Sequence, residues 1–525
     1  MSSVRTQSAA KKQSVESELL KLSTTLWQDI CSQPVPHSVP LLWKEHLQIR
    51  ELLDKMRSLN PPQSLFSDRI SRTAELDAFS KWADAVNIET FKVTVAAFDK
   101  FGLGLKATGD IEEKEPLVKV PRKAMITLDS VRKSSMLKKA YELDPIVKNM
   151  DNVALALYVL CEKLKGRESN WCKYLNVLPD HYTTPLYFSV EEFELLRPSS
   201  VFETALKMYR NIARQFAYFH LMLAPKSTES QSRISMLKPD KKPAEKAVPL
   251  LEKTPLTCLN FTFDAYKWAV ATVTTRINLV PSDQLTNDDG SPVQVPALIP
   301  YLDLANHGPA GVEDKMSVHY SVSDQKALCT ATQDYEFGDH VTIFYGPRTN
   351  IDHLVHNGFV PDTNYFDIYT VRLGLSKRDR LYAERVEQLR QLGLQPNESY
   401  DIRAGEDPIP LEMYRFARVF VSDMDDSTSA PNQVKAWKFL RDRFELLLHS
   451  YRSGKHRQLS STDGLPCAGL IARFLDGQQA ILEEAAGFAG RKVRQFQEKD
   501  IDADLRDLKL DHVIREPFKN FEGLD

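Results

Sequence analysis

The chain has 525 residues, of which 42% are hydrophobic and 26% are charged, so it is long enough for two or three globular domains. Its formal net charge of −3 lacks the basic excess that nucleic-acid-binding proteins usually carry. The six cysteines are scattered, without a C-x-x-C pair or a zinc-like spacing, and we therefore expect a reduced, intracellular protein without a metal.

The first fifteen residues, MSSVRTQSAAKKQSV, have no apolar core of the kind that a secretory signal needs. No run in the chain approaches the roughly 20 apolar residues of a membrane-spanning helix. We expect a soluble protein that begins with a flexible polar tail over residues 1–15.

Apolar residues then recur at helical spacing from residue 16 to about 59, with a proline-rich interruption at 34–40. This pattern predicts two helices within an N-terminal helical region, residues 16–78. From residue 79 the pattern changes, and FKVTVAAF, LGLKAT and PLVKVPR are typical of strands. The Gly102-x-Gly104 pair between them allows either a tight turn or the close approach of a ligand. A G-x-G-x-x-G motif is absent, so nothing supports a dinucleotide-binding fold.

The middle of the chain is mainly helical. Residues 151–164 predict a buried helix capped by Asp151, and 209–223 and 263–278 predict two more. Segment 224–255, rich in Lys, Ser, Glu and Pro, predicts a mobile surface loop. Arg214 and Arg276, on the second and third of these helices, are each either a solvated or dipole-complementing residue or a ligand contact.

Two short segments between residues 297 and 348 have a different character. ALIPYLDLANHG is an apolar, strand-like run that ends in Asp303, Asn306 and His307, and FGDHVTIFYGPR is a Gly-Asp turn that leads into a strand ending at Tyr345. Polar clusters at strand ends are common places for binding groups. Taken singly, Tyr345 also fits a core residue, His307 a structural histidine and Asn306 a turn cap.

Together, the order and spacing of N-H and G-D-x-[VI]-x-[IL]-x-Y-G resemble the two signature segments of SET-domain methyltransferases. That resemblance implies S-adenosyl-L-methionine as methyl donor. The chain lacks flanking cysteine clusters and has a large insertion at about 123–297, which is similar to the branch that contains Rubisco large-subunit methyltransferase. This branch implies an α+β fold: a knotted, β-rich SET core over 79–365 that the helical insertion splits, then an all-helical C-terminal substrate-binding domain over 366–525.

The resemblance also implies which residues form the site. Those expected to bind the cofactor are Arg72, Phe101, Gly102, Leu103, Arg276, Asp303, Leu304, Ala305, Asn306, His307, Asn357, Gly358 and Phe359. Tyr345 and Asn278 are expected in catalytic roles. The positions expected to contact the acceptor are Arg214, Leu302, Ile343 and Arg348, and Leu302 stands where the family has tryptophan. The Arg276 guanidinium suits a planar carboxylate, which implies the methionyl carboxylate as its partner.

Within this branch the chain is most similar to enzymes that methylate a histidine of actin. Actin is therefore the expected partner, the cytoplasm the expected location with nuclear presence also allowed, and a monomer the expected state. A lysine acceptor, with a pKa of about 10.4, must first lose a proton at a cost of roughly 4–5 kcal/mol at pH 7, whereas imidazole is already mostly neutral. The amide oxygen of Asn278 is able to accept a hydrogen bond from an imidazole N–H, which favours histidine.

Two other interpretations remain open from the sequence. The first is a lysine methyltransferase of the same branch, which Leu302 favours and Asn278 opposes. The second is a non-catalytic SET-like module that binds a protein through its C-terminal domain. The presence of Arg276, Asn306, His307 and Tyr345 together opposes the second interpretation.

Overall fold

The computed structural model describes residues 2–60, 71–223, 250–308, 317–423, 429–454 and 464–498. The chain divides into two compact units. The first unit contains residues 1–190, 200–346 and 352–359, and the second contains 191–199, 347–351 and 360–525. The long segment of the second unit thus begins at Val360, whereas the sequence predicts that the C-terminal domain begins at residue 366. Of the predicted loop 224–255, residues 224–249 lie outside the described residues.

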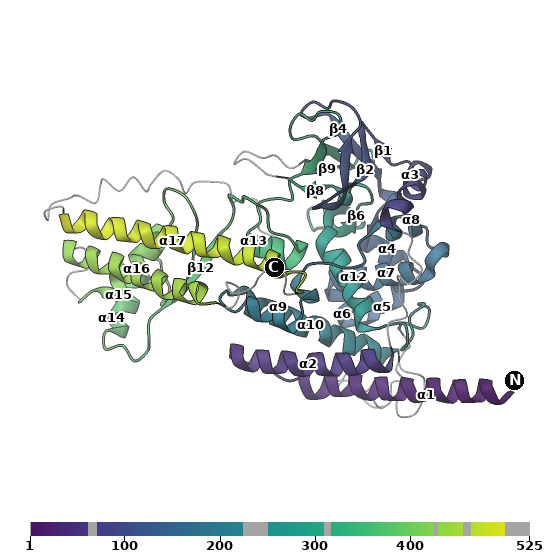
Figure 1. Cartoon of the computed structure of the whole chain (residues 1–525), viewed down its shortest axis with the longest axis horizontal. Coiled ribbons are helices and arrows are strands. Elements are labelled where there is room, and N and C mark those ends of the chain that lie inside the picture. The colour runs from purple at the N-terminus through teal and green to yellow at the C-terminus, as the bar shows by residue number, and fades with distance from the viewer. Residues whose placement is uncertain are drawn as a thin grey trace. The chain divides into compact units, whose positions relative to one another are not determined.

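The first unit opens with two long helices. Helix α1 (Ser2–Thr25) continues as a π-helical segment (Leu26–Cys31), and α2 (Val39–Leu59) begins within the proline-rich stretch. Figure 1 shows α1 and α2 side by side, and both pack against α10 (Val201–Met222). Residues 1–15, for which the sequence predicts a flexible polar tail, have a helical backbone from Ser2 onward. The Ala, Lys, Gln and Arg residues of this segment are good helix formers despite their polarity.

The centre of the first unit is the pair of helices α7 (Asp151–Lys165) and α12 (Phe263–Arg276), which pack on each other. Every residue from Val153 to Glu162 is buried, as the sequence of α7 predicts. Asp151 lies in the first turn rather than at the cap, which Met150 occupies without a side-chain hydrogen bond. Helix α12 ends at Arg276, so Asn278, which the sequence places in this helix, instead begins a strand.

Shorter helices complete the first unit. They are α3 (Leu76–Ala85), α4 (Leu128–Lys133), α5 (Lys138–Leu143), α6 (Pro145–Asn149) and α8 (Cys172–Val177). Most residues of α9 (Val190–Leu195) and of α13 (Asn350–Asp352) belong to the second unit. Helix α6 is held by Asp144, whose carboxylate accepts from the backbone N–H groups of Ile146 and Val147, an N-cap of the usual kind.

Among the described residues, the strands of the first unit form three small sheets. One has the order β1-β4-β10-β9, from Glu89–Thr90, Pro116–Pro121, Lys326–Thr330 and Val318–Ser321. The second has the order β2-β3-β11-β8, from Val93–Phe98, Gly102–Ala107, His340–Ile343 and Asn306–His307. The third has the order β5-β7-β6, from Ile126–Thr127, Pro292–Leu298 and Asn278–Thr286. The first two sheets therefore join strands from before and after the helical insertion, whereas the strands of the third sheet come from the two ends of the insertion itself.

The second sheet brings the two signature segments together. Strand β8 pairs in parallel with β11, with Asn306 opposite Thr342 and His307 opposite Ile343. The next residue, Gly308, donates its N–H to the Ile343 carbonyl at 3.1 Å. A Cβ at this position would lie 2.0 Å from Thr342 Oγ1, so only glycine fits where the two segments meet.

The second unit is not all-helical, which corrects the expectation from the resemblance. Strands β12 (Tyr369–Gly374) and β13 (Asn397–Ile402) form an antiparallel pair next to α14 (Tyr382–Gln391) and α15 (Leu411–Val421). The alternation of exposed Ser399 and Asp401 with buried Tyr400 and Ile402 is the signal for β13 that the sequence analysis overlooked.

Two long helices, α16 (Ala430–Arg452) and α17 (Ala468–Glu498), form the rest of the second unit and run side by side (Figure 1). The helical spacing of Trp437, Leu440, Phe444, Leu447 and Leu448 predicts an amphipathic face for this part of the chain. In α16 four of these side chains are at most 2% exposed, and Leu447 is half-buried. No helix in the described part of either unit is long and apolar enough to cross a membrane.

Candidate active site

The pairing of β8 with β11 places Tyr345 against the turn that precedes β8. The Tyr345 hydroxyl donates a hydrogen bond of 2.7 Å to the carbonyl of Ala305, and the Tyr345 backbone N–H donates to His307 Nδ1 at 3.3 Å. Both bonds are only partly buried, so the Tyr345 ring is not simply a core residue. Its hydroxyl has a fixed direction at the end of the strand.

His307 is surrounded by aromatic rings. Its ring centroid lies 5.3 Å from that of Tyr345, 4.7 Å from His353 and 5.6 Å from Phe359. Because its Nδ1 also accepts from a backbone N–H, the ring is held on several sides and shapes the site through packing. These contacts fix the position of the His307 ring, and its contact with the cofactor stays a prediction.

Asn306 connects three strands. Its Nδ2 donates to the Leu103 carbonyl of β3 at 3.1 Å and lies 3.1 Å from His340 Nε2 of β11. A Cβ on Gly104 would lie 2.5 Å from Asn306 Nδ2, so this glycine makes room for a side chain of the protein. Gly102, with a φ of +72°, supplies the turn before β3. The two glycines of the Gly102-x-Gly104 pair therefore have different functions.

A buried polar cluster lies at the end of α12. Tyr174, which is fully buried, donates a short hydrogen bond to Asp303 Oδ2. The guanidinium of Arg276 lies 5.8 Å from the ring centroid of Tyr182, whose hydroxyl bonds to Thr272 at 2.7 Å. Two buried atoms in this cluster have no hydrogen-bond partner, Asp303 Oδ1 and Arg276 Nε.

The charges in this cluster influence one another strongly. Burial raises the pKa of Asp303 to about 7, although Arg276 and the hydrogen bond from Tyr174 act in the opposite direction. Burial acts to lower the pKa of Arg276, but the nearby Tyr182 and Asp303 raise it overall. Burial raises the pKa of Tyr182, and both Arg276 and Arg72 oppose this effect. Asp303 is thus close to titration at neutral pH, whereas Arg276 stays charged.

Arg72, which begins a 3₁₀ turn before α3, lies close enough to the same cluster to influence the pKa of Tyr182. Its Nε donates to the Val177 carbonyl at 2.8 Å, and its Nη1 would lie 3.6 Å from a Cβ on Gly102. The guanidinium groups of Arg72 and Arg276 and the carboxyl group of Asp303 form a donor and acceptor set for a ligand that has both a carboxylate and an ammonium group. The two unpartnered buried atoms, Arg276 Nε and Asp303 Oδ1, belong to this set.

Asn278 follows Arg276 by two residues and is partly buried at the start of β6. Its Nδ2 donates to the Arg276 carbonyl at 3.1 Å. Since an amide has its donor and acceptor on opposite sides, this bond commits the nitrogen and leaves Oδ1 as the acceptor for another group.

The segment 357–359 closes against the same helix end. Asn357 Nδ2 lies 3.4 Å from the Thr275 carbonyl, and the Thr183 hydroxyl donates to the Gly358 carbonyl. Gly358 has a φ of +79°, and a Cβ there would lie 2.9 Å from the backbone nitrogen of Thr184. Glycine is therefore required both by the backbone conformation and by the close contact.

The remaining cofactor-binding candidates are mainly apolar. Leu103, Leu304 and Ala305 are 6%, 3% and 1% exposed, so the groups that they offer to a ligand are on the backbone. Phe101 is 56% exposed, and its ring centroid lies 4.8 Å from that of His340.

The acceptor-side candidates are not all brought together. Arg214 is exposed on α10 with its guanidinium 5.5 Å from the ring centroid of Trp27, and its contact with the acceptor stays a prediction. Leu302 and Ile343 are 1% and 6% exposed, so the Leu302 side chain packs in the core instead of lining an open pocket. Arg348 belongs to the second unit, where its carbonyl accepts from Asn364 Nδ2 at 2.8 Å.

Sequence reasoning missed several residues of the site. Tyr174 and Tyr182 lie in a stretch rich in aromatic residues, whose pattern fits a buried core, and nothing in the sequence shows that the Tyr174 hydroxyl bonds to Asp303. Tyr301 has a φ of +74°, an uncommon conformation for a residue with a side chain, and the strained position immediately precedes the 3₁₀ turn Leu302–Leu304.

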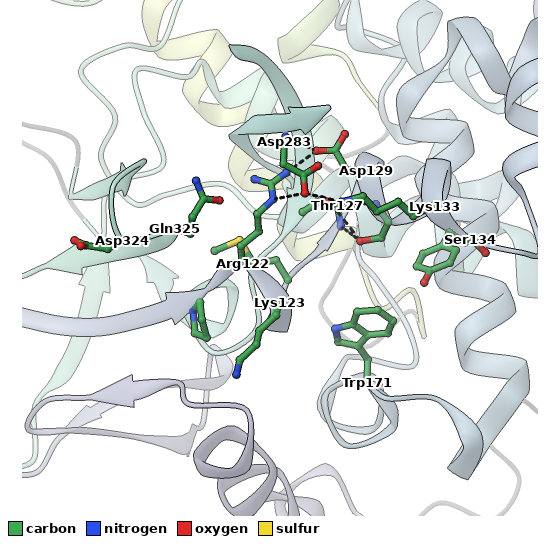
Figure 2. Close-up of a pocket in the computed structure, with 14 residues that line it drawn as sticks. Arg122, Lys123, Thr127, Asp129, Lys133, Ser134, Trp171, Asp283, Asp324 and Gln325 are labelled. Atoms are coloured by element: carbon green, nitrogen blue, oxygen red, sulfur yellow. Dashed lines mark hydrogen bonds and ion pairs between the residues drawn. The ribbon is translucent and has the colours of Figure 1, made fainter. Parts of the chain in front are cut away.

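A separate cavity of about 650 Å³ lies beside α4, and none of the expected site residues lines it. Figure 2 shows the side chains of Arg122, Asp129, Asp283 and Lys133 pointing toward one another, whereas those of Lys123 and Asp324 point away from this group. Arg122 is 2.6 Å from Asp129 and 3.8 Å from Asp283, and Lys133 is 2.6 Å from Asp283. Because these charges are already paired, the cavity offers less to a charged ligand than the cluster around Arg276.

Comparison with known proteins connects this geometry to a family. The model for Rubisco LSMT substrate-binding matches residues 376–463. The actin-histidine N-methyltransferase of Gallus gallus is 32% identical over 493 residues, which covers 89% of this chain and 77% of the chicken protein. The enzyme of the same name from Mus musculus is 33% identical over 495 residues, with coverage of 89% and 77%. The chain belongs to the actin-histidine N-methyltransferase family.

Solved structures agree on the fold of this family member. Rubisco LSMT bound to sinefungin and monomethyllysine superposes with a TM-score of 0.58 at 19% identity, covering 84% of this chain and 97% of that one. The SET domain of LSMT bound to lysine and AdoHcy gives a TM-score of 0.59 at 18% identity, with coverage of 83% and 97%. The α+β fold class expected from the resemblance is confirmed.

Proposed function

We propose that this chain is an S-adenosylmethionine-dependent protein methyltransferase that modifies a histidine side chain of actin. The observation that carries the choice of acceptor is the hydrogen bond from Asn278 Nδ2 to the Arg276 carbonyl. It leaves Asn278 Oδ1 as an acceptor next to the arginine expected to hold the cofactor. An imidazole that donates one N–H to this oxygen has its other nitrogen unprotonated and ready to attack.

The residues around Arg276 fit the amino-acid end of the cofactor. Arg276 and Arg72 supply guanidinium groups for a carboxylate, and Asp303 Oδ1 and Arg276 Nε are buried atoms that still lack partners. When bound, S-adenosylmethionine supplies a methyl carbon on a sulfonium centre. The chain's own task is to orient the acceptor and to exclude water.

Tyr345 acts at the acceptor end of the same site. Its hydroxyl is fixed by the bond to the Ala305 carbonyl, and oxygen atoms held in this way can stabilise a methyl group through weak C–H···O contacts. Each contact is small, so its effect depends on an arrangement that exists before the substrate binds.

We also infer that the two signature segments cross as a knot, which the parallel pairing of β8 with β11 supports. The second unit would bind the protein substrate, in line with the match of residues 376–463 to a substrate-binding model. We propose a monomer that binds no nucleic acid and works in the cytoplasm, where actin is found, with nuclear presence also allowed.

A lysine acceptor has less support than histidine. The residue that favours a lysine acceptor is Leu302, in place of the family's tryptophan, but the Leu302 side chain is 1% exposed in the core.

The direct test is methyl transfer from labelled S-adenosylmethionine to purified actin, with the modified residue mapped by mass spectrometry. Label on a single actin histidine supports the donor and the acceptor together. Label on a lysine, or on other proteins of a lysate but not on actin, contradicts the proposed acceptor. No label together with no binding of S-adenosylmethionine would favour a non-catalytic binding module.

A further inference from the structure

We propose that His340 is a positioning residue for the site, whose unprotonated Nε2 holds the side-chain amide of Asn306 in one orientation. His340 lies at the start of β11 and was not among the residues expected from the sequence. The inference deepens the proposed function, because Asn306 is one of the residues expected to contact the cofactor.

The orientation of the Asn306 amide follows from its neighbours. The atom 3.1 Å from the Leu103 carbonyl must be the amide nitrogen, since a carbonyl oxygen has no proton to donate. The opposite orientation would place two oxygen atoms against each other. Oδ1 of Asn306 therefore points away from Leu103 and stays available as an acceptor.

The same nitrogen determines the state of His340. It lies 3.1 Å from His340 Nε2 and has a second proton to donate. Nε2 must then accept, so the ring is neutral and carries its proton on Nδ1. Burial lowers the pKa of His340, which agrees with a neutral ring.

The imidazole is itself held in place. Its ring centroid lies 3.9 Å from that of Phe98 with an angle of 24° between the planes, and 4.8 Å from that of Phe101. On the other side, a Cβ on Gly104 would lie 2.8 Å from His340 Nε2 and 2.5 Å from Asn306 Nδ2. The absence of a side chain at Gly104 thus allows the contact, and the two phenylalanines fix its partner.

The contact joins the loop at Phe101–Leu103 to the β8 turn. Both segments are expected to bind the cofactor, and the amide of Asn306 is bound to both β3 and β11. Without an acceptor at residue 340, one amide proton loses its partner and the amide gains freedom to rotate. We therefore expect weaker cofactor binding with little loss of folding stability.

The test compares two substitutions in the full-length protein. His340→Gln keeps an acceptor oxygen for Asn306, whereas His340→Phe keeps a ring for stacking on Phe98 but removes the acceptor. Isothermal titration with S-adenosylhomocysteine is expected to give at least a fivefold higher Kd for His340→Phe and a change of less than twofold for His340→Gln. Melting temperatures of both variants should stay close to that of the wild type.

Equal dissociation constants for the wild type and His340→Phe would overturn the proposal. A second measurement does not depend on the ligand: ¹⁵N chemical shifts of histidine-labelled protein, with His340 assigned from its loss in His340→Gln. A neutral ring with its proton on Nδ1 is expected. A ring protonated on Nε2 would overturn the proposal, whether or not S-adenosylhomocysteine binds. Failure of the wild-type protein to bind S-adenosylhomocysteine would instead count against the proposed function.

Discussion

The hydroxyl of Tyr345 donates a 2.7 Å hydrogen bond to the carbonyl of Ala305, which lies 40 residues earlier in the chain. The bond links the end of β11 to the turn that leads into β8. Because β8 and β11 also pair directly, the hydroxyl is held by two independent constraints. A group held this firmly loses little entropy when it interacts with a transition state, which makes it a candidate for a catalytic contact.

Tyr345→Phe should therefore lower kcat more than it raises KM. We expect a decrease in kcat of about ten- to a hundredfold, because the hydroxyl contributes mainly in the transition state. The measurement is steady-state methyl transfer to actin. Tyr335→Phe is a matched control, because Tyr335 is not among the expected site residues. Its hydroxyl also donates to a backbone carbonyl, that of Thr342 on β11, at 3.1 Å. A change in KM alone for Tyr345→Phe would make Tyr345 a binding residue.

Asn278→Ala should lower histidine methylation at least tenfold and leave the Kd for the cofactor unchanged. The substitution removes the Oδ1 acceptor that orients the imidazole but leaves the Arg276 side chain intact. Product analysis on actin and a separate cofactor titration distinguish the two effects. Leu279→Ala serves as control, because its side chain is 50% exposed next to Asn278. Unchanged turnover in Asn278→Ala would remove the argument for a histidine acceptor.

Asp303→Asn should increase stability, and more so at pH 8 than at pH 5. In the folded protein the pKa of Asp303 is raised to about 7, above the ordinary 3.8, so the folded state holds the proton more tightly than the unfolded state does. The stability that this proton provides is fully present below about pH 4 and is lost as the pH rises through 7. Each unit between the two pKa values corresponds to about 1.4 kcal/mol. Asparagine does not titrate and avoids this loss.

The measurement for Asp303→Asn is the melting temperature relative to the wild type at both pH values, without cofactor. Asp288→Asn, at an exposed position, should give the same small difference at pH 5 and pH 8. A stabilisation by Asp303→Asn that is larger at pH 5 would contradict the raised pKa of the carboxyl group.

Gly358→Ala should destabilise the protein more than Gly290→Ala does. Both glycines have positive φ, +79° and +82°, so alanine costs roughly 1–2 kcal/mol at either position. Only at Gly358 does the new Cβ also meet the backbone, 2.9 Å from Thr184 N, whereas nothing lies within 4 Å at Gly290. Urea unfolding of the two variants measures the difference. Equal losses would show that the segment at 357–359 can move away from Thr184 at little cost.

The sequence by itself determined the parts of the fold that depend on local patterns. Continuous apolar residues predicted the buried helix α7, and the period of Trp437, Leu440 and Phe444 predicted the buried face of α16. Motif order placed Asn306, His307 and Tyr345 in one site, because a short polar segment at a strand end is a local feature that survives in the sequence. Where local propensity was weak, as in β13, the prediction failed.

Only the tertiary structure decided which groups meet across long separations. Tyr174 and Asp303 are 129 residues apart, and no periodicity records that the hydroxyl of one reaches the carboxylate of the other. The same holds for Gly104, whose missing side chain is explained by Asn306 and His340, and for Arg214, whose guanidinium lies near the ring of Trp27. Burial, unpartnered atoms and pKa values belong to the environment of a residue, and that environment is formed by strands and helices that the chain brings together only on folding.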